Sequence, residues 1–280
     1  MSIWRRAISP TVKARLAELD LDFSDYGLDP YGLSREHVGA FYSFLELFYR
    51  YYFRVQVFGI DNVPARGRAM LVCNHSGGVP ADGGMIVASM FFEHQPPRHV
   101  HGMVEKFAQN WPVVSPFFSK VGQFPGLPEN AVRILESERL LMVFPEGAKG
   151  LGKLYRDRYH LERFGTGFMR IALYTKTPII PIAFVGGEES MPTVFHAKRL
   201  AKLVGAPYWP VPPYLVPMPM PLNCELHYGE PITFEGTGNE RDDVIEDYVA
   251  EVRGKIEGLI ASGRRIHGSL AGRREEARGR

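Results

Sequence analysis

A histidine and a carboxylate flank a glycine-rich bend in the segment NHSGGVPAD, residues 74–82. A histidine side chain with a pKa of about 6.5 acts as a general base near neutral pH when a partner fixes its tautomer. Asp82 is placed to be that partner for His75, because Gly77 and Gly78 allow backbone conformations with positive φ that would turn Asp82 back onto the ring. The same glycines would let the loop aim N–H groups at a developing oxyanion. The alternative is that His75 only caps a turn.

No protein nucleophile stands beside this pair. The sequence lacks the G-x-S-x-G pattern, and Ser76 is too close to His75 in sequence to present its hydroxyl to that ring without a special turn. His99 and His101 alternate without a further clustered ligand, so no metal site is predicted. The pattern therefore favours a reaction in which a substrate hydroxyl, deprotonated by His75, attacks an activated acyl group, with no cofactor.

The elements that must position these groups follow from apolar periodicity. Strands are predicted at 53–58, 69–73, 98–105, 139–147, 177–187 and 224–234, and helices at about 10–19, 34–52, 83–94, 168–176 and 241–262. Strands that alternate with helices indicate an α/β fold whose central, mostly buried sheet is flanked by helices. Reactive side chains of such folds gather in loops beyond the strand ends, as NHSGGVPAD and FPEGAKG do here.

The chain divides into three parts. Residues 1–52 form an N-terminal helical appendage, 53–262 the catalytic domain, and 263–280 a basic tail that we expect to be disordered. Residues 34–52 are apolar around most of the predicted helix, which fits either a core helix or a helix at a lipid interface. The last twenty residues carry six arginines and two glutamates, which fits a solvated end or a contact with anionic lipid.

Composition narrows the class of protein. A chain of 280 residues with 45% apolar and 23% charged residues is globular, and a net charge of +2 gives no reason to expect nucleic acid as a partner. The longest uncharged run, 203–224, contains seven prolines, so no transmembrane helix is predicted and membrane contact must be peripheral. Cys73 and Cys224 are expected to be buried free thiols, which suits a reducing compartment and the cytoplasmic face of a membrane.

Four blocks carry a resemblance to a known family. NHSGGVPAD is followed in order by VGQFPGLPENA (121–131), VFPEGAKG (143–150) and TPIIPIAFVGGEE (177–189). Together they resemble the glycerolipid (lysophospholipid) acyltransferase family of acylglycerol-phosphate acyltransferase-like enzymes, and most of all its branch related to monoacylglycerol and diacylglycerol acyltransferases. The resemblance extends from about Phe53 to Phe234.

The resemblance implies an O-acyltransferase of glycerolipid and phospholipid biosynthesis. His75 would be the general base, Asp82 would orient it, and an acyl thioester of coenzyme A or acyl carrier protein would be the co-substrate attacked by a lipid acceptor. Glu146 and Gly147 correspond to the Pro-Glu-Gly block beside the acceptor. The alternative for Glu146 is a carboxylate that only caps a helix in a turn. The full set of expected substrate-binding residues is Asn74, Ser76, Gly77, Gly78, Phe124, Glu146, Gly147 and Lys149.

Two departures from the family pattern bear on the site. Six residues separate His75 from Asp82, where the family has four, and no arginine lies near Phe124, where the family meets the phosphate of its acceptor. A phosphate-bearing and a neutral acceptor therefore both stay open.

Two segments have open alternatives. The cations Lys149, Lys153, Arg156 and Arg158 would bind acceptor or donor phosphates, or form a solvated loop face. The proline-rich stretch 206–221 would either cover the sheet edge or wall an acyl tunnel and dip into lipid through residues such as Trp209 and Met218.

Two rival functions remain beside acyl transfer. One is a lipid-binding protein without catalytic activity, in which the longer His–Asp spacing reflects lost chemistry. The other is a hydrolase in which His75 activates water against an ester or thioester.

Overall fold

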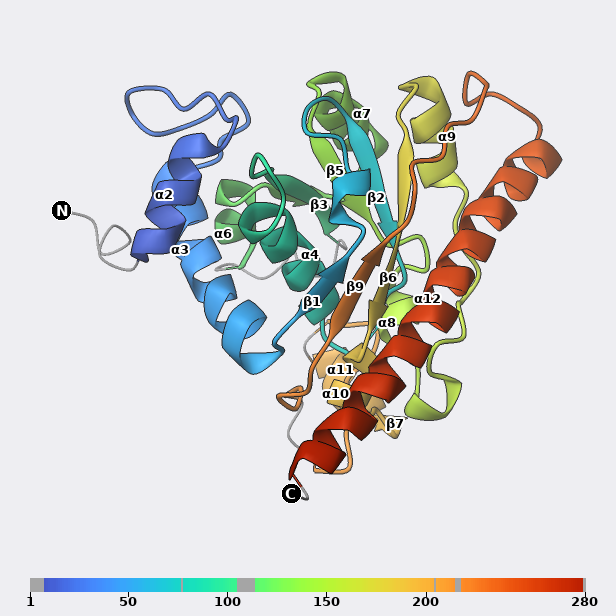
Figure 1. Cartoon of the computed structure of the whole chain (residues 1–280). Coiled ribbons are helices and arrows are strands. Elements are labelled where there is room, and N and C mark those ends of the chain that lie inside the picture. Colours follow the sequence, from blue (N-terminus) through green and yellow to red (C-terminus); the bar gives the residue numbers. More distant parts are fainter. Residues whose placement is uncertain (1–7, 77, 105–113, 204, 215–217, 279–280) are drawn as a thin grey trace.

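A computed structural model of the chain describes residues 8–76, 78–104, 114–203, 205–214 and 218–278. One sheet of seven strands in the order β1-β9-β6-β2-β5-β3-β4 forms its centre (Figure 1). The strands are β1 (Gln56–Phe58), β2 (Ala69–Cys73), β3 (Val100–Val104), β4 (Gln123–Pro125), β5 (Leu140–Val143), β6 (Ile179–Val185) and β9 (Glu225–Tyr228). Between the described strands of this sheet, β6 and β9 pair antiparallel and the other neighbours pair parallel.

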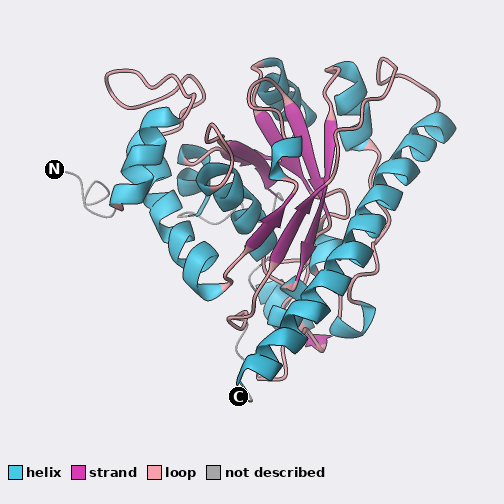
Figure 2. Cartoon of the chain, viewed as in Figure 1, coloured by secondary structure: helices cyan, strands magenta, loops and turns pink. Residues whose placement is uncertain are grey.

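The middle of the sheet is buried on both faces. Every residue of β2, β6 and β9 is buried, as expected of mostly parallel strands with helices on both sides. Leu71 of β2 lies opposite Met142 of β5 and Ile180 of β6, and the three side chains belong to one core. The predicted α/β class with a mostly buried sheet flanked by helices is confirmed (Figure 2).

Among the described residues, all five predicted helices are present with shifted ends, and five further helices were not predicted. They are α2 (Pro10–Glu18), α3 (Arg35–Glu46), α4 (Ala81–Phe92), α6 (Val114–Lys120), α7 (Pro128–Glu136), α8 (Ala148–Leu151), α9 (Gly167–Tyr174), α10 (Gly187–Ser190), α11 (Lys198–Leu203) and α12 (Asp242–Arg278). Helix α12 packs along β6 and β9, whereas α4 packs against β3 and α3. Short 3-10 turns at Ile60–Asn62 and Tyr155–Asp157 and a two-stranded sheet, β7 (Phe195–His196) with β8 (Pro210–Val211), complete the described elements.

The N-terminal helix is core on one side only, so the core alternative for residues 34–52 holds in part and the lipid alternative stays a prediction. After α3 the chain continues as a π-helical segment, η1 (Leu47–Tyr52). One side is core: Tyr42 is buried and its ring stacks on Phe91 of α4 with 3.7 Å between centroids. The other side is open to solvent, where the described large apolar side chains are Phe44, Leu47 and Tyr51.

Helix α12 is longer than expected. It was predicted to end near residue 262 and to be followed by a disordered tail over 263–280, but it continues to Arg278. Residues 242–280 contain no proline, and alanine, arginine and glutamate favour helix, so no local signal ends it. Among the described residues, no helix is long and apolar enough to cross a bilayer.

Candidate active site

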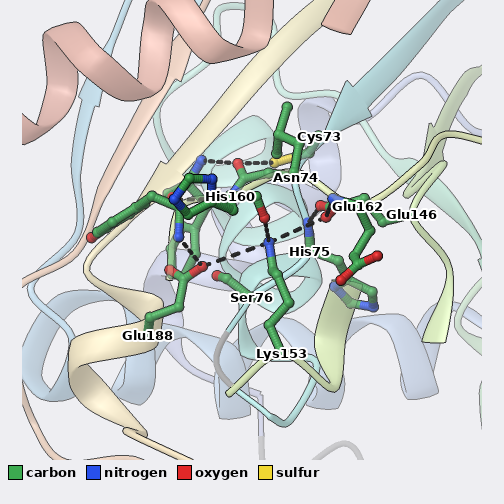
Figure 3. Close-up of polar contacts among 12 residues, drawn as sticks. Cys73, Asn74, His75, Ser76, Glu146, Lys153, His160, Glu162 and Glu188 are labelled. Atoms are coloured by element: carbon green, nitrogen blue, oxygen red, sulfur yellow. Dashed lines mark hydrogen bonds and ion pairs between the residues drawn. The ribbon is translucent and has the colours of Figure 1, made fainter. Parts of the chain in front are cut away.

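Three loops meet at the carboxyl ends of the central strands. Strands β2, β5 and β6 are parallel, so the segments that follow them emerge at one edge of the sheet. His75 follows β2, Glu146 follows β5 and Glu188 follows β6. Figure 3 shows the Glu146 and Glu188 side chains around Lys153, with the His75 backbone N–H bonded to Glu146.

The six-residue spacing brings Asp82 onto His75. Asp82 lies in the first turn of α4 and is fully buried, and its Oδ2 is 2.7 Å from His75 Nδ1. The same carboxylate accepts the backbone N–H of Ser76 at 2.9 Å and of Gly83 at 2.7 Å. Because an acceptor-only carboxylate faces Nδ1, that nitrogen carries the proton and Nε2 is left with a lone pair. Gly78, at φ +68°, supplies the backbone turn that the two extra residues require.

The backbone donors of this loop are largely in use within the protein. His75 N–H donates to Glu146 Oε1, Ser76 N–H to Asp82 Oδ2, and Gly78 N–H to the Leu151 carbonyl. We expected the loop to aim such groups at an oxyanion. At these three positions they hold the loop in place instead, and Gly77 lies outside the described residues.

Glu146 is a buried structural hub. Oε1 accepts the His75 N–H at 2.8 Å, and Oε2 accepts the Glu162 N–H at 2.7 Å and the Lys153 ammonium at 3.2 Å. A carboxylate with these three partners ties the loop after β5 to the loop that carries His75 (Figure 3). Glu146 is therefore more than a turn cap.

Lys153 lies between two buried carboxylates. Its Nζ also donates to the His160 carbonyl at 3.0 Å and is 3.8 Å from Glu188 Oε1. Burial raises the pKa of Glu188 to about 7, and Lys153 opposes that rise. The other oxygen of Glu188, Oε2, has no hydrogen-bond partner among the described residues.

A cavity of about 290 Å³ opens beside the His75 ring. Most of its lining is apolar, from Met103, Val104, Gly126, Val143 and Phe144, together with His75 and Gly147. Phe144 stacks on the His75 ring with 4.0 Å between centroids and 18° between planes. The hydrogen bond to Asp82 alone does not set the orientation of the ring plane, and the stacking on Phe144 does. An apolar cavity of this kind suits a fatty acyl group beside a base.

The remaining predicted binding residues divide between cavity and scaffold. Gly147 lines the His75 cavity, whereas the Asn74 amide exchanges two hydrogen bonds with the Phe184 backbone and so joins β2 to β6. Ser76 is buried, and its hydroxyl has no hydrogen-bond partner among the described residues. Phe124 is buried in β4 and stacks on His101, and the lining of the His75 cavity does not include it.

The four cations after the third block do not form one cluster. Lys153 is buried in its ion pairs, Arg156 pairs with Asp157 at the surface, and Arg158 lies over the Tyr155 ring. Lys149 is exposed and lines a second cavity, of about 390 Å³, whose other lining residues include Glu162, His196 and Tyr208.

Comparison with known proteins gives the family. The acyltransferase family model matches residues 54–185, which span β2, the His75–Asp82 pair, Glu146 and β6. An uncharacterised protein of Mycobacterium leprae is 38% identical over 262 residues, covering 89% of this chain and 70% of that protein. The chain belongs to the acyltransferase family.

Two further similarities extend this assignment. A protein of Gallus gallus described as a DGAT1/2-independent enzyme synthesizing storage lipids is 25% identical over 219 residues, which cover 77% of this chain and 61% of that protein. The crystal structure of the 1-acyl-sn-glycerophosphate acyltransferase PlsC from Thermotoga maritima superimposes with a TM-score of 0.56 over 82% of each chain, at 14% identity. The second similarity bears on the fold alone.

The structure adds three residues to the candidate site that sequence reasoning did not single out for it. Phe144 and Glu188 lie in the quoted blocks, Phe144 inside the strand predicted at 139–147 and Glu188 directly after the strand predicted at 177–187, and that position was the available signal. Lys153 was predicted only as one of four loop cations. Its burial depends on Glu146, seven residues away, and on Glu188, which is distant in sequence.

Proposed function

We propose that this acyltransferase moves a fatty acyl group from an acyl thioester, of coenzyme A or acyl carrier protein, to a hydroxyl of a glycerolipid or lysophospholipid. The observation that carries the proposal is the His75 Nδ1–Asp82 Oδ2 contact of 2.7 Å beside an apolar cavity. It supports a ring that is held in one tautomer, with Nε2 left for a substrate proton.

The proposed reaction is direct transfer. His75 Nε2 takes the proton of the acceptor hydroxyl as its oxygen attacks the thioester carbon, and the carbon–oxygen bond forms. The tetrahedral intermediate then collapses, the carbon–sulfur bond breaks, and the thiolate leaves with the proton that His75 held. Asp82 stabilises the imidazolium between these steps.

We further propose that acceptors without a phosphate monoester are favoured. Glu146 and Glu188 are buried near His75, and Lys153 is already engaged by both. A phosphate dianion brought next to this group would meet buried negative charge in a medium of low dielectric. The description of the Gallus gallus relative as synthesizing storage lipids agrees with such an acceptor.

We also propose peripheral attachment to the cytoplasmic face of a membrane through the N-terminal segment. The exposed side chains of Phe44, Leu47 and Tyr51 follow one another along the solvent side of α3 and η1. An exposed apolar strip on a helix suits insertion into the headgroup region.

The test is release of free thiol from long-chain acyl-coenzyme A by the purified protein. Glycerol phosphate, lysophospholipid and monoacylglycerol are offered in turn to wild type and to His75→Ala. Acceptor-dependent release that disappears in the variant supports transfer, and the acceptor that responds tests the preference for a neutral hydroxyl.

The other possible outcomes of this test would support one of the two rival functions. Release without acceptor, together with free fatty acid, would favour a hydrolase. The lipid-binding alternative would be favoured by two results together. No thiol is released with any acceptor or with acyl carrier protein as donor, and lipid binding is unchanged in His75→Ala.

A further inference from the structure

The connection between β6 and β9 forms a separate surface at the same edge as His75. Because β6 and β9 are antiparallel, the segment that leaves the carboxyl end of β6 also returns to this edge before β9 begins. It contains α10, β7, α11 and β8, which Figure 1 places together at the lower end of the sheet. The surface therefore lies beside the candidate active site.

This segment exposes unusually many large apolar side chains. Of the fifteen exposed large hydrophobic residues among those described, seven belong to it, namely Val194, Phe195, Leu200, Leu203, Tyr214, Met218 and Leu222. Leu203 is 81% exposed and Met218 60%. Scattered exposed apolar residues are ordinary, but a concentration within one connection marks a contact surface.

After the two glutamates of α10, the charge of the same segment has one sign. Residues 190–224 contain no aspartate or glutamate, although 31 acidic residues among 280 would place about four in a stretch of this length. Its cations, Lys198, Arg199 and Lys202, are all exposed and alternate with the leucines of α11. The buried residue of that helix, Ala201, turns toward the protein.

The C-terminal half of α12 adds positive charge nearby. Gly263 packs against Val185 at the end of β6, and the Arg264 guanidinium lies 4.7 Å from the centroid of the Tyr159 ring. Helix α12 thus reaches the edge where the connection lies, and the sequence from residue 261 onward carries six arginines and two glutamates.

We infer that this surface, which we call the α11 surface (Val194, Phe195 and Lys198–Leu203), docks on a bilayer that contains anionic lipids. Apolar side chains interleaved with cations fit the boundary between headgroups and acyl chains, and the cations add electrostatic attraction. A second copy of the chain fits less well, since a two-fold contact would set these cations against one another with no acidic partner in residues 190–224.

The connection that carries the α11 surface also contacts the N-terminal segment, whose proposed attachment to the membrane is the basis of this inference. The Tyr52 hydroxyl of η1 donates to the Pro219 carbonyl, and Arg54 donates to the Pro221 carbonyl. Two contacts at one edge orient the molecule, whereas one helix alone leaves it free to tilt. The edge that carries the His75 cavity then faces the lipid, so an acceptor reaches Nε2 from the bilayer.

The test is co-sedimentation with vesicles of phosphatidylcholine alone and of phosphatidylcholine mixed with phosphatidylglycerol. Wild type is expected to bind the mixed vesicles more tightly, and added salt should remove the difference. Leu200→Ser with Leu203→Ser should weaken binding to both vesicles by about tenfold or more. Replacing Lys198, Arg199 and Lys202 by glutamine should remove the preference for the anionic vesicles, with roughly a fivefold loss per cation.

Tyr174→Ser is the matched control, because Tyr174 is 61% exposed at the end of α9, whose chain leads into the opposite edge of the sheet. It should bind like wild type. The inference is overturned if the leucine pair binds both vesicles as wild type does, or if that pair changes the oligomeric state in solution while wild type does not bind vesicles.

Two further readouts separate this inference from the proposed function. Phe44→Ser with Leu47→Ser tests the N-terminal attachment independently. Thiol release from a short-chain acyl thioester in detergent should be unchanged in the α11 variants, since they do not touch the His75 cavity. Loss of vesicle binding with retained release supports the α11 surface, whereas absent release in every protein counts against the acyltransferase proposal and leaves the binding result standing.

Discussion

Lys153 and Glu146 form a buried ion pair at 3.2 Å, and the same Glu146 carboxylate accepts the backbone N–H of His75. Lys153, in the loop after α8, therefore holds the Glu146 carboxylate, and that carboxylate holds the loop of His75. The pair is shielded from water, with side-chain exposures of 2% and 0%. This arrangement makes Lys153 a positioning residue, since it contacts the scaffold of His75 and not the ring.

Lys153→Met is expected to lower both stability and thiol release. Removal of one partner from a buried pair leaves uncompensated charge on Glu146 and Glu188, at a cost of about 3–5 kcal/mol in the free energy of unfolding. Urea denaturation measures that loss. Adding Glu188→Gln to the variant should recover part of it, and Lys149→Met, at an exposed position, should unfold like wild type. Lys153→Met with wild-type stability would contradict the buried pair.

Asp82→Asn is expected to slow acyl transfer by about a hundredfold or more while the protein stays folded. Asparagine cannot stabilise the imidazolium, and its amide NH₂ can bring the wrong tautomer to His75. Thiol release at saturating donor and acceptor measures the rate, and circular dichroism checks the fold. The exposed Asp61→Asn serves as control. Equal rates for both variants would remove Asp82 from the mechanism.

Stability should fall as the pH drops below about 6.5, because two histidines are buried as neutral rings. Burial lowers the pKa of His99 to about 4, with a smaller effect of Arg139, and burial and His99 lower the pKa of His101 well below its usual range. Tyr42, Asp29 and Arg139 are the other polar groups that face this pair.

The direction of this change in stability depends on whether the folded or the unfolded protein binds protons first as the pH falls. Both pKa values are depressed in the folded protein, so the unfolded chain takes up protons first as the pH falls, and each histidine reduces stability by up to about 1.4 kcal/mol per pH unit between about 6.5 and 4. Urea denaturation at a series of pH values should show a shallower slope in His99→Leu. The exposed His160→Gln should keep the wild-type slope, and parallel slopes for all three proteins would contradict the assignment.

Gly147→Ala is expected to destabilise the protein by about 1–3 kcal/mol and to reduce activity. Gly147 has φ 58° and ψ −152°, a conformation that favours glycine, and it lies between Glu146 and the first residue of α8. A strained backbone there would displace Glu146 from the His75 N–H. Thermal unfolding compares this variant with Gly254→Ala, where a new methyl group meets nothing within 4 Å and should stabilise α12 slightly. Similar shifts in both variants would argue against strain at Gly147.

Local pattern was enough to predict the layers of this protein. The run AMLVC was predicted as a strand, and β2 has the same bounds. Five consecutive apolar residues before a glycine-rich loop are typical of a fully buried strand. The pairing of His75 with Asp82 could also be predicted from the sequence, since both lie in one short segment whose glycines permit the turn. The short strand β4 was not predicted, because three residues carry no period of their own.

The sequence by itself determined the fold class, the buried strands and the loop that holds His75 and Asp82, since these depend on neighbours close in the chain. Only the tertiary structure decided that Lys153 is an internal partner and not a surface cation, that Phe144 stacks on His75, and that η1 and the α11 surface share one edge. Those outcomes depend on which distant segments the sheet brings together. The charge and apolarity of a residue do not specify whether it meets water, a carboxylate or lipid.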